Sequence, residues 1–296
     1  MVGRRRLKLS RLTKVYWPQA GFTKGDMIDY YTRIAPVLLP HLRDRPLTLK
    51  RYPEGVEGMM FYEKNCPDHR PPWVKTASVW SEGNGRDMSY CLAQDLPTLV
   101  WVAQLGSIEL HTSLSRRLHL ERPTALVFDL DPGPPASIVE CCRVALRLRE
   151  WFGANRLQAF CKTSGSKGLQ VYAPLNLKVD YDRTKTIARD LAQHLAGEFP
   201  DQVVYQQRRA LRAGKVLIDW SQNDQSKTTV SAYSLRARAR PTVSTPVTWD
   251  EVGACAELGQ ADLLVFEAGE VLSRIERLGD LFAPVLTLKQ KLPDAL

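Results

Sequence analysis

Short apolar or alternating stretches predict β-strands at residues 47–52, 126–130, 169–173 and 215–220. Longer stretches with apolar residues every three or four positions predict helices near residues 95–105, 137–152, 182–199, 248–258 and 269–279. Another helix is expected from Thr23, where Asp26 completes a capping signal, until Pro36 bends or ends it. Strands and helices mix irregularly, which predicts an α/β or α+β sheet domain.

The stretch at residues 126–133 carries the first candidate chemistry. It is an apolar strand that ends in Asp129-Leu130-Asp131 and is stopped by Pro-Gly. Side chains alternate along a strand, so Asp129 and Asp131 share one face, while Leu126, Phe128 and Leu130 point into the core. Two carboxylates roughly 7 Å apart can clamp a pair of divalent cations. A solvated turn at a strand end is an equally open interpretation.

Asp219 supplies a third carboxylate, at the end of the strand at residues 215–220. Three acids at strand ends, brought into one cleft, suit two-metal phosphoryl-transfer chemistry. Crowding like charges is costly without cations, which makes such a cluster functional if it forms. Taken alone, Asp219 is more typical of an acid that caps a turn.

Two basic segments suit phosphate binding. Residues 164–168, Ser-Gly-Ser-Lys-Gly, offer amides, Ser164, Gly165 and Lys167 before a strand, although a plain tight turn is the alternative. In extended conformation, Arg236, Arg238 and Arg240 place three guanidiniums on one face, suited to a triphosphate or a nucleic-acid backbone. A charged edge strand is a serious rival interpretation of that row.

Cations next to aromatic residues form a further group suited to phosphates and stacked bases: Lys14, Lys24, Phe61, Tyr62 and Lys64. Each of them is singly more typical of a surface lysine or a core ring. His111, at a predicted strand end, suits a sugar hydroxyl or a phosphate, with a structural histidine as the default.

Composition narrows the class of protein. The 296 residues are 44% hydrophobic, which is typical of a globular chain, and no apolar run reaches the roughly 18 residues of a membrane span. The net charge of +9 favours a polyanionic partner such as nucleic acid. Residues 1–14 are expected to form a basic arm rather than a transit peptide. The six cysteines lack metal-ligand spacing, so buried thiols in a reducing cytoplasm are expected, not disulfides or zinc.

In order along the chain, the motifs Phe-Asp-Leu-Asp-Pro-Gly, Lys-Thr-Ser-Gly-Ser-Lys-Gly-Leu, Val-Leu-Ile-Asp-Trp-Ser-Gln-Asn and Tyr-Ser-Leu-Arg-Ala-Arg resemble those of a known family. This family is the polymerase domain of bacterial DNA ligase D, in the archaeo-eukaryotic primase superfamily. Further matches at residues 21–26, 45–51 and 61–65 extend the resemblance over nearly all the chain.

The resemblance implies an α+β fold of the archaeo-eukaryotic primase type: an RNA-recognition-like mixed sheet with flanking helices and an N-terminal α/β extension. The implied organisation is a single catalytic domain over residues 1–296. Within it, residues 1–105 would bind DNA ends, residues 106–260 would form the catalytic sheet, and residues 261–296 would form a C-terminal helical part.

The resemblance also implies roles for single residues. Asp129, Asp131 and Asp219 would be the catalytic ligands of two divalent ions, Mn²⁺ or Mg²⁺. Ser164, Gly165, Lys167, Arg236 and Arg238 would hold the incoming triphosphate, helped by Lys50 and Arg212, and His111 would favour a ribose 2'-hydroxyl. Lys14 and Lys24 would grip the 5'-phosphate of the downstream strand, and Phe61 and Tyr62 would stack on DNA beside Lys64. Many relatives carry His where this chain has Gln170, and glutamine can hydrogen-bond but cannot carry a positive charge.

The implied activity is template-directed nucleotidyl transfer with a preference for ribonucleotides, at gaps and ends of DNA in non-homologous end joining. Its implied partners are 5'-phosphorylated DNA, nucleoside triphosphates, Ku and a DNA ligase, without a membrane and in the cytoplasm, associated with the nucleoid. No Lys-x-Asp-Gly ligase motif occurs, so the chain is expected to be a stand-alone member or an excised domain. A primase of the same superfamily and a catalytically idle DNA-end-binding scaffold are the alternatives.

Overall fold

The structure, a computed structural model, describes residues 1–293. The chain forms two compact units and passes between them several times. The first unit holds Met1–Leu120, Thr228–Ser244 and Phe266–Gly279, and the second holds Glu121–Lys227, Thr245–Val265 and the residues from Asp280 onward. The functional division at residues 105 and 260 stays a prediction, because packing units need not coincide with functional parts.

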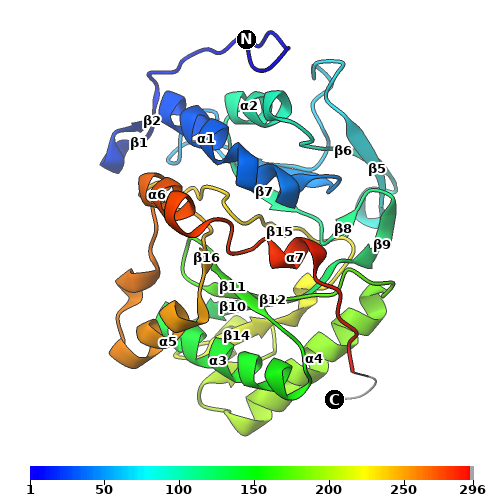
Figure 1. Cartoon of the computed structure of the whole chain (residues 1–296), viewed down its shortest axis with the longest axis vertical. Helices are drawn as coiled ribbons and strands as arrows, with labels where there is room; N and C mark the ends of the chain where they lie inside the picture. The colour runs from blue at the N-terminus through cyan, green and yellow to red at the C-terminus, as the bar shows by residue number, and fades with distance from the viewer. Residues whose placement is uncertain (294–296) are drawn as a thin grey trace. The chain divides into compact units, whose positions relative to one another are not determined.

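A six-stranded sheet forms the centre of the second unit, with strands in the order β13-β14-β10-β12-β11-β16. The chain enters it as β10, α3, β11, β12, α4 and β14, a β-α-β-β-α-β order with antiparallel central pairs (Figure 1). The expected RNA-recognition-like mixed sheet with flanking helices is therefore confirmed. The strands are β10 (Ala125–Pro132), β11 (Phe160–Thr163), β12 (Leu169–Pro174), β13 (Val203–Val204), β14 (Val216–Asp219) and β16 (Pro246–Val247), and the helices are α3 (Ile138–Ala154), α4 (Tyr181–Glu198), α5 (Trp249–Leu258) and α7 (Pro284–Thr287).

The alternating pattern of β10 decides which face of this sheet the helices cover. Leu126, Phe128 and Leu130 are fully buried, and the ring of Phe128 meets Phe152 of α3 edge to face at 5.9 Å between centroids. The predicted capping box at the start of α3 is present, and the helix ends two residues beyond Phe152, at Ala154. Because α3 and α4 pack against β10, Asp129 and Asp131 are left on the opposite face.

The first unit has its own six-stranded sheet, in the order β15-β7-β3-β6-β5 with β4 also paired to β3. Its helix α1 (Lys24–Leu42) begins with the predicted Thr23–Asp26 capping box. The expectation that Pro36 bends or ends this helix is wrong in its stronger form: buried Ile34 and Leu38 hold both sides of Pro36 in the core, and the helix continues to Leu42. The other elements are β1 (Val15–Trp17), β2 (Phe22–Thr23), β3 (Leu47–Arg51), β4 (Phe61–Glu63), β5 (Thr76–Ser81), β6 (Arg86–Cys91), β7 (Ser107–Thr112), β15 (Thr229–Val230), α2 (Leu96–Gln104) and α6 (Ala268–Leu278), and a short pair, β8 (Ser115–Arg116) with β9 (His119–Pro123), precedes β10.

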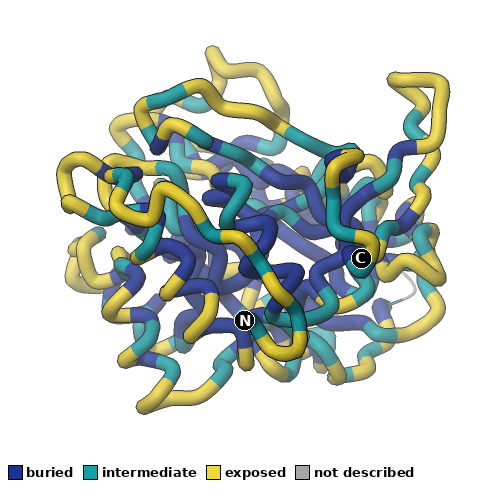
Figure 2. The backbone as a smooth tube through the Cα atoms, turned by 90° about the horizontal axis from the view of Figure 1, so that it is seen from above, coloured by how far each residue is buried: buried dark blue, intermediate teal, exposed yellow. Residues whose placement is uncertain are grey.

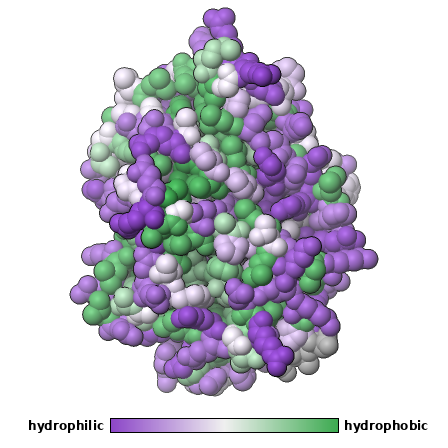
Figure 3. Space-filling model, in the orientation of Figure 1, coloured by the Kyte–Doolittle hydropathy of each residue, from purple (hydrophilic) through white to green (hydrophobic). Residues whose placement is uncertain are grey.

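Each unit buries its own core. In the first, Trp17, Tyr30 and Tyr31 are at most 2% exposed, and in the second Phe128 and Phe152 are fully buried. The dark blue segments of Figure 2 are these inner strands and helix faces, and the exposed segments are mainly turns and loops. Polar residues cover much of the face drawn in Figure 3, and no helix within residues 1–293 is long and apolar enough to cross a membrane.

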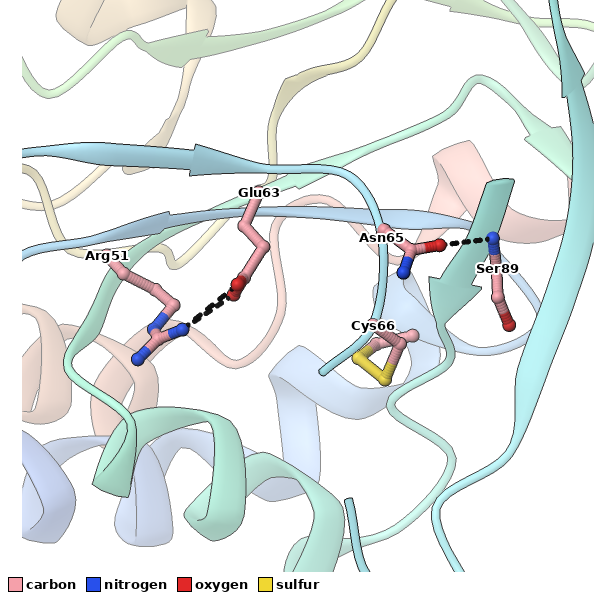
Figure 4. The surroundings of a disulfide bond; sticks show 6 residues. Arg51, Glu63, Asn65, Cys66 and Ser89 are labelled. Carbon is pink, nitrogen blue, oxygen red and sulfur yellow. Dashed lines mark hydrogen bonds and ion pairs between the residues drawn. A yellow bond between two sulfur atoms is a disulfide. The ribbon is translucent and has the colours of Figure 1, made fainter. Parts of the chain in front are cut away.

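A disulfide joins Cys66 and Cys91 in the first unit (Figure 4). The expectation of thiols throughout is wrong for this pair and holds for Cys141, Cys142, Cys161 and Cys255, which are buried and free. The two cysteines meet because β4 and β6 pair along the same edge of β3, so Cys66, three residues after β4, comes beside Cys91 at the end of β6. Asn65 strengthens this contact, since its side-chain oxygen accepts the amide hydrogen of Ser89 at 2.9 Å.

Candidate active site

The three predicted acids of the second unit lie on neighbouring strands. β10 and β14 pair antiparallel with Asp129 directly opposite Asp219, and Asp131 lies opposite Leu217 two pairs further on. Directly opposite residues place their side chains on the same face, with Cβ atoms about 5 Å apart. Asp131 shares that face because it is two residues from Asp129. The structure thus brings together the carboxylates that the sequence singled out.

Crowding of these carboxylates changes their chemistry. The pKa of Asp129 is raised to about 7, chiefly because the group is removed from water and further because Asp131 and Asp219 are negatively charged neighbours. A hydrogen bond from Gln170 and the positive charge of Lys162 act in the opposite direction. The site therefore holds more negative charge than its own residues neutralise, which is the condition that a divalent cation relieves.

Asp129 belongs to a row of polar side chains that crosses four strands in register. Asp219 lies opposite Asp129, Asp129 opposite Gln170, and Gln170 opposite Lys162. Lys162 is 1% exposed, and its Nζ donates to Oε1 of Gln170 at 2.5 Å. A buried ammonium thus supports the glutamine that contacts Asp129. The sequence reasoning overlooked Lys162, although its place two residues before the Ser164 loop was a signal.

Asp219 is held by a network of its own. Its Oδ1 accepts hydrogen bonds from the amide and the hydroxyl of Ser221, at 3.0 and 2.6 Å, and from Nε2 of Gln207 at 2.9 Å. Oδ2 accepts from Nε2 of Gln222 at 3.1 Å. Gln207 also accepts from Arg212 at 3.0 Å, which links that predicted nucleotide-binding residue to Asp219.

The acid set matches divalent metals in donor type, because Mg²⁺ and Mn²⁺ favour carboxylate oxygens. Within residues 1–293, no three Asp, Glu, His or Cys side chains stand in a ready metal-binding arrangement. Oδ1 of Asp219 faces three protein donors, whereas Oδ2 accepts only the hydrogen bond from Gln222 among the residues described. A carboxylate oxygen has two lone pairs, so Oδ2 is the better placed of the two for an ion.

The loop at residues 164–168 forms the tight, amide-rich turn that its sequence suggests. Oγ of Ser164 accepts from the amides of Ser166 and Gly168, at 3.2 and 3.1 Å, and Gly165 has a φ of 66°. A Cβ on Gly168 would lie 2.1 Å from the carbonyl oxygen of Leu130, so only glycine lets the loop sit against the acid-bearing strand. Lys167 is exposed on this loop.

The backbone around Arg212 approaches the same strand end as closely. A Cβ on Gly133 would lie 1.8 Å from the carbonyl oxygen of Arg212. Two predicted nucleotide-binding segments of the second unit, around Lys167 and Arg212, therefore flank β10 where Asp129 and Asp131 stand.

In the first unit, a buried glutamate that the sequence reasoning missed gathers three of the predicted residues. Oε2 of Glu109 lies 3.1 Å from Nζ of Lys50, 2.9 Å from Nε2 of His111 and 3.3 Å from Nε of Arg236. Its Oε1 accepts the amide hydrogen of Ala237 at 3.1 Å. Glu109 is 2% exposed, and these donors hold its pKa far below the ordinary value despite burial. The pattern Glu-x-His on one strand face was the available signal.

The predicted row of three arginines is wrong. The chain pairs as an extended bridge only at Leu235 with Val243, and then turns, with the amide of Arg238 donating to the carbonyl of Arg236 at 2.9 Å. Arg236 consequently points to Glu109, while Arg240 pairs with Glu267. Arg238 is exposed in the turn. The β-type alternation fails because the segment pairs with Glu109 and Glu267 instead of a strand.

Tyr62 of β4 joins the Glu109 cluster, with its ring centroid 6.4 Å from that of His111. Phe61 and Tyr62 are 46% and 49% exposed, unusual values for such large rings. Lys64 follows them on the same segment and is partly buried. These aromatic residues are available for stacking.

Lys14 and Lys24 lie together at the start of α1. The amide of Lys24 donates to the carbonyl of Lys14 at 2.8 Å, and Lys14 pairs with Glu54. The pKa of the buried Lys24 side chain is lowered to about 8, chiefly by burial and further by the charges of Arg11 and Lys14. A lysine that lacks counter-charge in this way is suited to an anion.

Comparison with known proteins supports this picture. A sequence model described as "LigD, primase-polymerase domain" matches residues 23–282. The chain is 38% identical over 282 residues to the "Multifunctional non-homologous end joining protein LigD" of Mycolicibacterium smegmatis, covering 95% of this chain and 36% of that protein. It is also 38% identical to the LigD repair protein of Mycobacterium tuberculosis H37Rv, covering 98% of this chain and 39% of the relative. The chain thus spans less than two fifths of these relatives.

A solved structure is similar over nearly the whole chain. It is the "Polymerase Domain from Mycobacterium tuberculosis Ligase D in complex with DNA", with a TM-score of 0.88 and 36% sequence identity. The match covers 97% of this chain and 100% of that one.

Proposed function

Since this chain belongs to the LigD primase-polymerase family, whose members are nucleotidyltransferases, we propose that it adds nucleotides to broken DNA during bacterial non-homologous end joining. The reaction is template-directed extension at gaps and ends, with ribonucleotides preferred. The observation that supports it most strongly is the register that sets Asp129 opposite Asp219, beside Asp131.

Asp129, Asp131 and Asp219 are the proposed ligands of two divalent ions, Mn²⁺ or Mg²⁺. Bound there, such ions supply Lewis-acid activation of the attacking hydroxyl and neutralise charge on the leaving pyrophosphate. The raised pKa of Asp129 supports the assignment, because the acids are crowded at a cost that bound cations would offset. Ser221 and Gln207 hold Asp219 in its orientation through hydrogen bonds to Oδ1.

Nucleotide binding is assigned to residues of each unit. In the second, the amides of the loop at Ser164 and Gly165, with Lys167 and Arg212, suit the triphosphate. In the first, Lys50, Arg236 and Arg238 supply positive charge, and His111 is the proposed partner of the ribose 2'-hydroxyl. The contact between His111 and Glu109 supports this role, because it fixes the imidazole orientation.

DNA binding is assigned to lysines and aromatic residues of the first unit. Lys14 and Lys24 suit a 5'-phosphate, since Lys24 is buried beside the positive charges of Arg11 and Lys14, and both effects lower its pKa. Phe61 and Tyr62 offer ring faces for base stacking beside Lys64. A Ku-type end-binding protein and a DNA ligase are the proposed partners of the complete repair reaction.

Primer extension on a gapped duplex with a 5'-phosphate tests the proposal, with Mn²⁺ and either ribo- or deoxyribonucleotides. Asp129→Ala is expected to lower extension at least 10³-fold, whereas Asp190→Ala, a surface change on α4, leaves it unchanged. Extension by Asp129→Ala at the wild-type rate would refute the metal assignment. Synthesis without a primer would instead favour a primase, and DNA binding without any incorporation would favour a scaffold.

A further inference from the structure

The N-terminal arm, residues 2–11, precedes the part of the chain that the family model matches. Its residues alternate in exposure: Arg4, Arg6 and Lys8 are exposed, while Arg5, Leu7 and Leu9 are partly buried. The tube that leaves the N-terminus in Figure 2 accordingly changes between yellow and teal. Val2 and Arg5 close a turn over Gly3 and Arg4, and from Arg6 onward the alternation marks an extended segment that lies on a surface with one face turned outward.

The arm is fixed to α2 and its surroundings at Arg5 and at Ser10. The guanidinium of Arg5 lies 4.5 Å above the ring of Trp73 and 3.7 Å from a carboxylate oxygen of Asp95. Further along, Oγ of Ser10 accepts from Nε2 of Gln104 at 2.8 Å, and the amide of Ser10 donates to Oε1 of Gln104 at 3.3 Å. The arm therefore has a defined course over the first unit (Figure 1).

The outward face carries positive charge without local compensation. The side chains of Arg4, Arg6 and Lys8 make no ion pair or hydrogen bond with any residue in the described range 1–293. Arg11, the next cation along, lies 3.8 Å from Glu54 with both side chains largely exposed. In Figure 3 the atoms at the top, where the chain begins, are strongly hydrophilic. A row of this kind is available to an extended polyanion.

The end of the arm is tied to the lysines assigned to the 5'-phosphate. The amide of Gly25 donates to the carbonyl of Leu12, and the amide of Lys24 donates to the carbonyl of Lys14, both at 2.8 Å. Arg11 is close enough to contribute to the lowered pKa of Lys24. Positive charge is therefore continuous from Lys24 and Lys14 back along the arm to Arg4.

We propose that the N-terminal arm is a second DNA-binding surface, which grips the backbone of the duplex that extends beyond the 5'-phosphate. The inference rests on the proposed function in taking DNA as the polyanion and in placing its 5'-phosphate at Lys14 and Lys24. From Arg6 to Arg11 an extended chain spans about 16 Å, the rise of about five base pairs, and the turn at residues 2–5 carries Arg4 beyond it. The outward cations Arg6 and Lys8 lie about 7 Å apart, which corresponds to the rise of two nucleotides along one strand.

The test compares two triple variants of the full chain that lose the same charge. R4Q/R6Q/K8Q empties the outward face of the arm, and R147Q/K178Q/R189Q removes three exposed cations from the second unit. Fluorescence anisotropy measures binding to a gapped duplex at several salt concentrations. The arm variant is expected to reduce the slope of log affinity against log salt by about 2.7, at 0.9 per lost phosphate contact, and the control to leave it unchanged.

Two further readouts separate the arm from the phosphate site. Shortening the duplex beyond the 5'-phosphate below about five base pairs should remove the difference between wild type and the arm variant. Preference for a 5'-phosphorylated gap should survive in the arm variant and be lost in K14A/K24A. An equal loss of binding to duplexes of every length would contradict the proposed course of the DNA.

A salt slope that is the same for the arm variant and wild type would overturn the inference and show a merely solvated arm. This result is distinguishable from failure of the proposed function, because primer extension by wild type and its loss in Asp129→Ala are measured on the same substrate. Weaker binding of single-stranded DNA alone, with duplex binding unchanged, would also overturn the inference.

Discussion

Oε2 of Glu109 lies 2.9 Å from Nε2 of His111, and both groups are held away from water. Because the same oxygen faces Lys50 and Arg236, this one carboxylate fixes three groups assigned to nucleotide binding. Its loss would leave two buried or partly buried cations without their counter-charge, a change that typically costs about 3 kcal/mol or more.

Glu109→Gln is therefore expected to lower the free energy of unfolding by about 3 kcal/mol in denaturant titrations. It should also raise KM for ribonucleotides more than KM for deoxyribonucleotides, since His111 loses its orientation. Glu63→Gln, which breaks the more exposed pair with Arg51, is the control and should cost less than about 1 kcal/mol. Unchanged discrimination between the two sugars would contradict the role of the pair.

The raised pKa of Asp129 predicts how the free energy of unfolding of the metal-free protein depends on pH. Its pKa in the folded protein is raised to about 7 from an ordinary 3.8, so the unfolded chain ionises first. The contribution of Asp129 to the free energy of unfolding is therefore fully present below about pH 4 and declines as the pH rises to about 7. Relative to Asp129→Asn, wild type should lose up to about 4 kcal/mol over that interval.

Thermal unfolding at several pH values, with a chelator present, measures this difference. Addition of Mn²⁺ at pH 7 should restore much of the loss in wild type and less in the Asn variant. Parallel pH profiles for the two proteins would show that Asp129 is not crowded as described.

Lys162 and Gln170 predict a coupled contribution to stability. Lys162→Met removes the donor and leaves Oε1 of a buried glutamine with fewer partners, at a cost of about 1 to 3 kcal/mol. In a double-mutant cycle with Gln170→Leu, the double variant should lose less stability than the sum of the losses in the two single variants, by at least about 0.5 kcal/mol. Lys167→Met, on the exposed loop, is the control and should change stability by less than about 0.5 kcal/mol. Full additivity would mean that the two side chains act independently.

The disulfide predicts a redox-dependent stability of the first unit. Cys66 and Cys91 are 25 residues apart, and closing a loop of that length stabilises a fold by about 3 kcal/mol in the chain-entropy account. The variant C66S/C91S should therefore melt several degrees lower than wild type without reductant. In dithiothreitol sufficient to reduce the wild type, the two should converge. If the variant still melts lower than wild type after reduction, the difference comes from the serine substitutions and not from loss of the disulfide.

The local sequence pattern was enough to predict the face of a strand on which each side chain lies. It was not enough to predict which residues of neighbouring strands lie opposite one another. Asp129 and Asp131 were placed correctly because alternation along one strand has a fixed period. The approach of Asp219 was expected only from its strand-end position and the family resemblance, whereas its pairing opposite Asp129 depends on register between strands 90 residues apart.

The same dependence on contacts between distant segments explains which features the sequence did not predict. Glu109, Lys162 and the Cys66–Cys91 pair acquire their meaning only from partners that distant segments bring to them. The arginines at residues 236–240 were predicted to share one face of an extended segment because they alternate with apolar residues. Bonds to Glu109 and Glu267 impose a turn there instead, an outcome that no local propensity encodes.

Gly133 and Gly168 have a consequence for redesign of this protein. Both bring a neighbouring backbone within van der Waals distance of the acid-bearing strand, where even a methyl group has no room. A side chain at either glycine would therefore push the Lys167 loop or the Arg212 segment away from the strand that carries Asp129. Attempts to change the substrate of this catalyst should therefore alter side chains on those segments and leave their lengths and glycines intact.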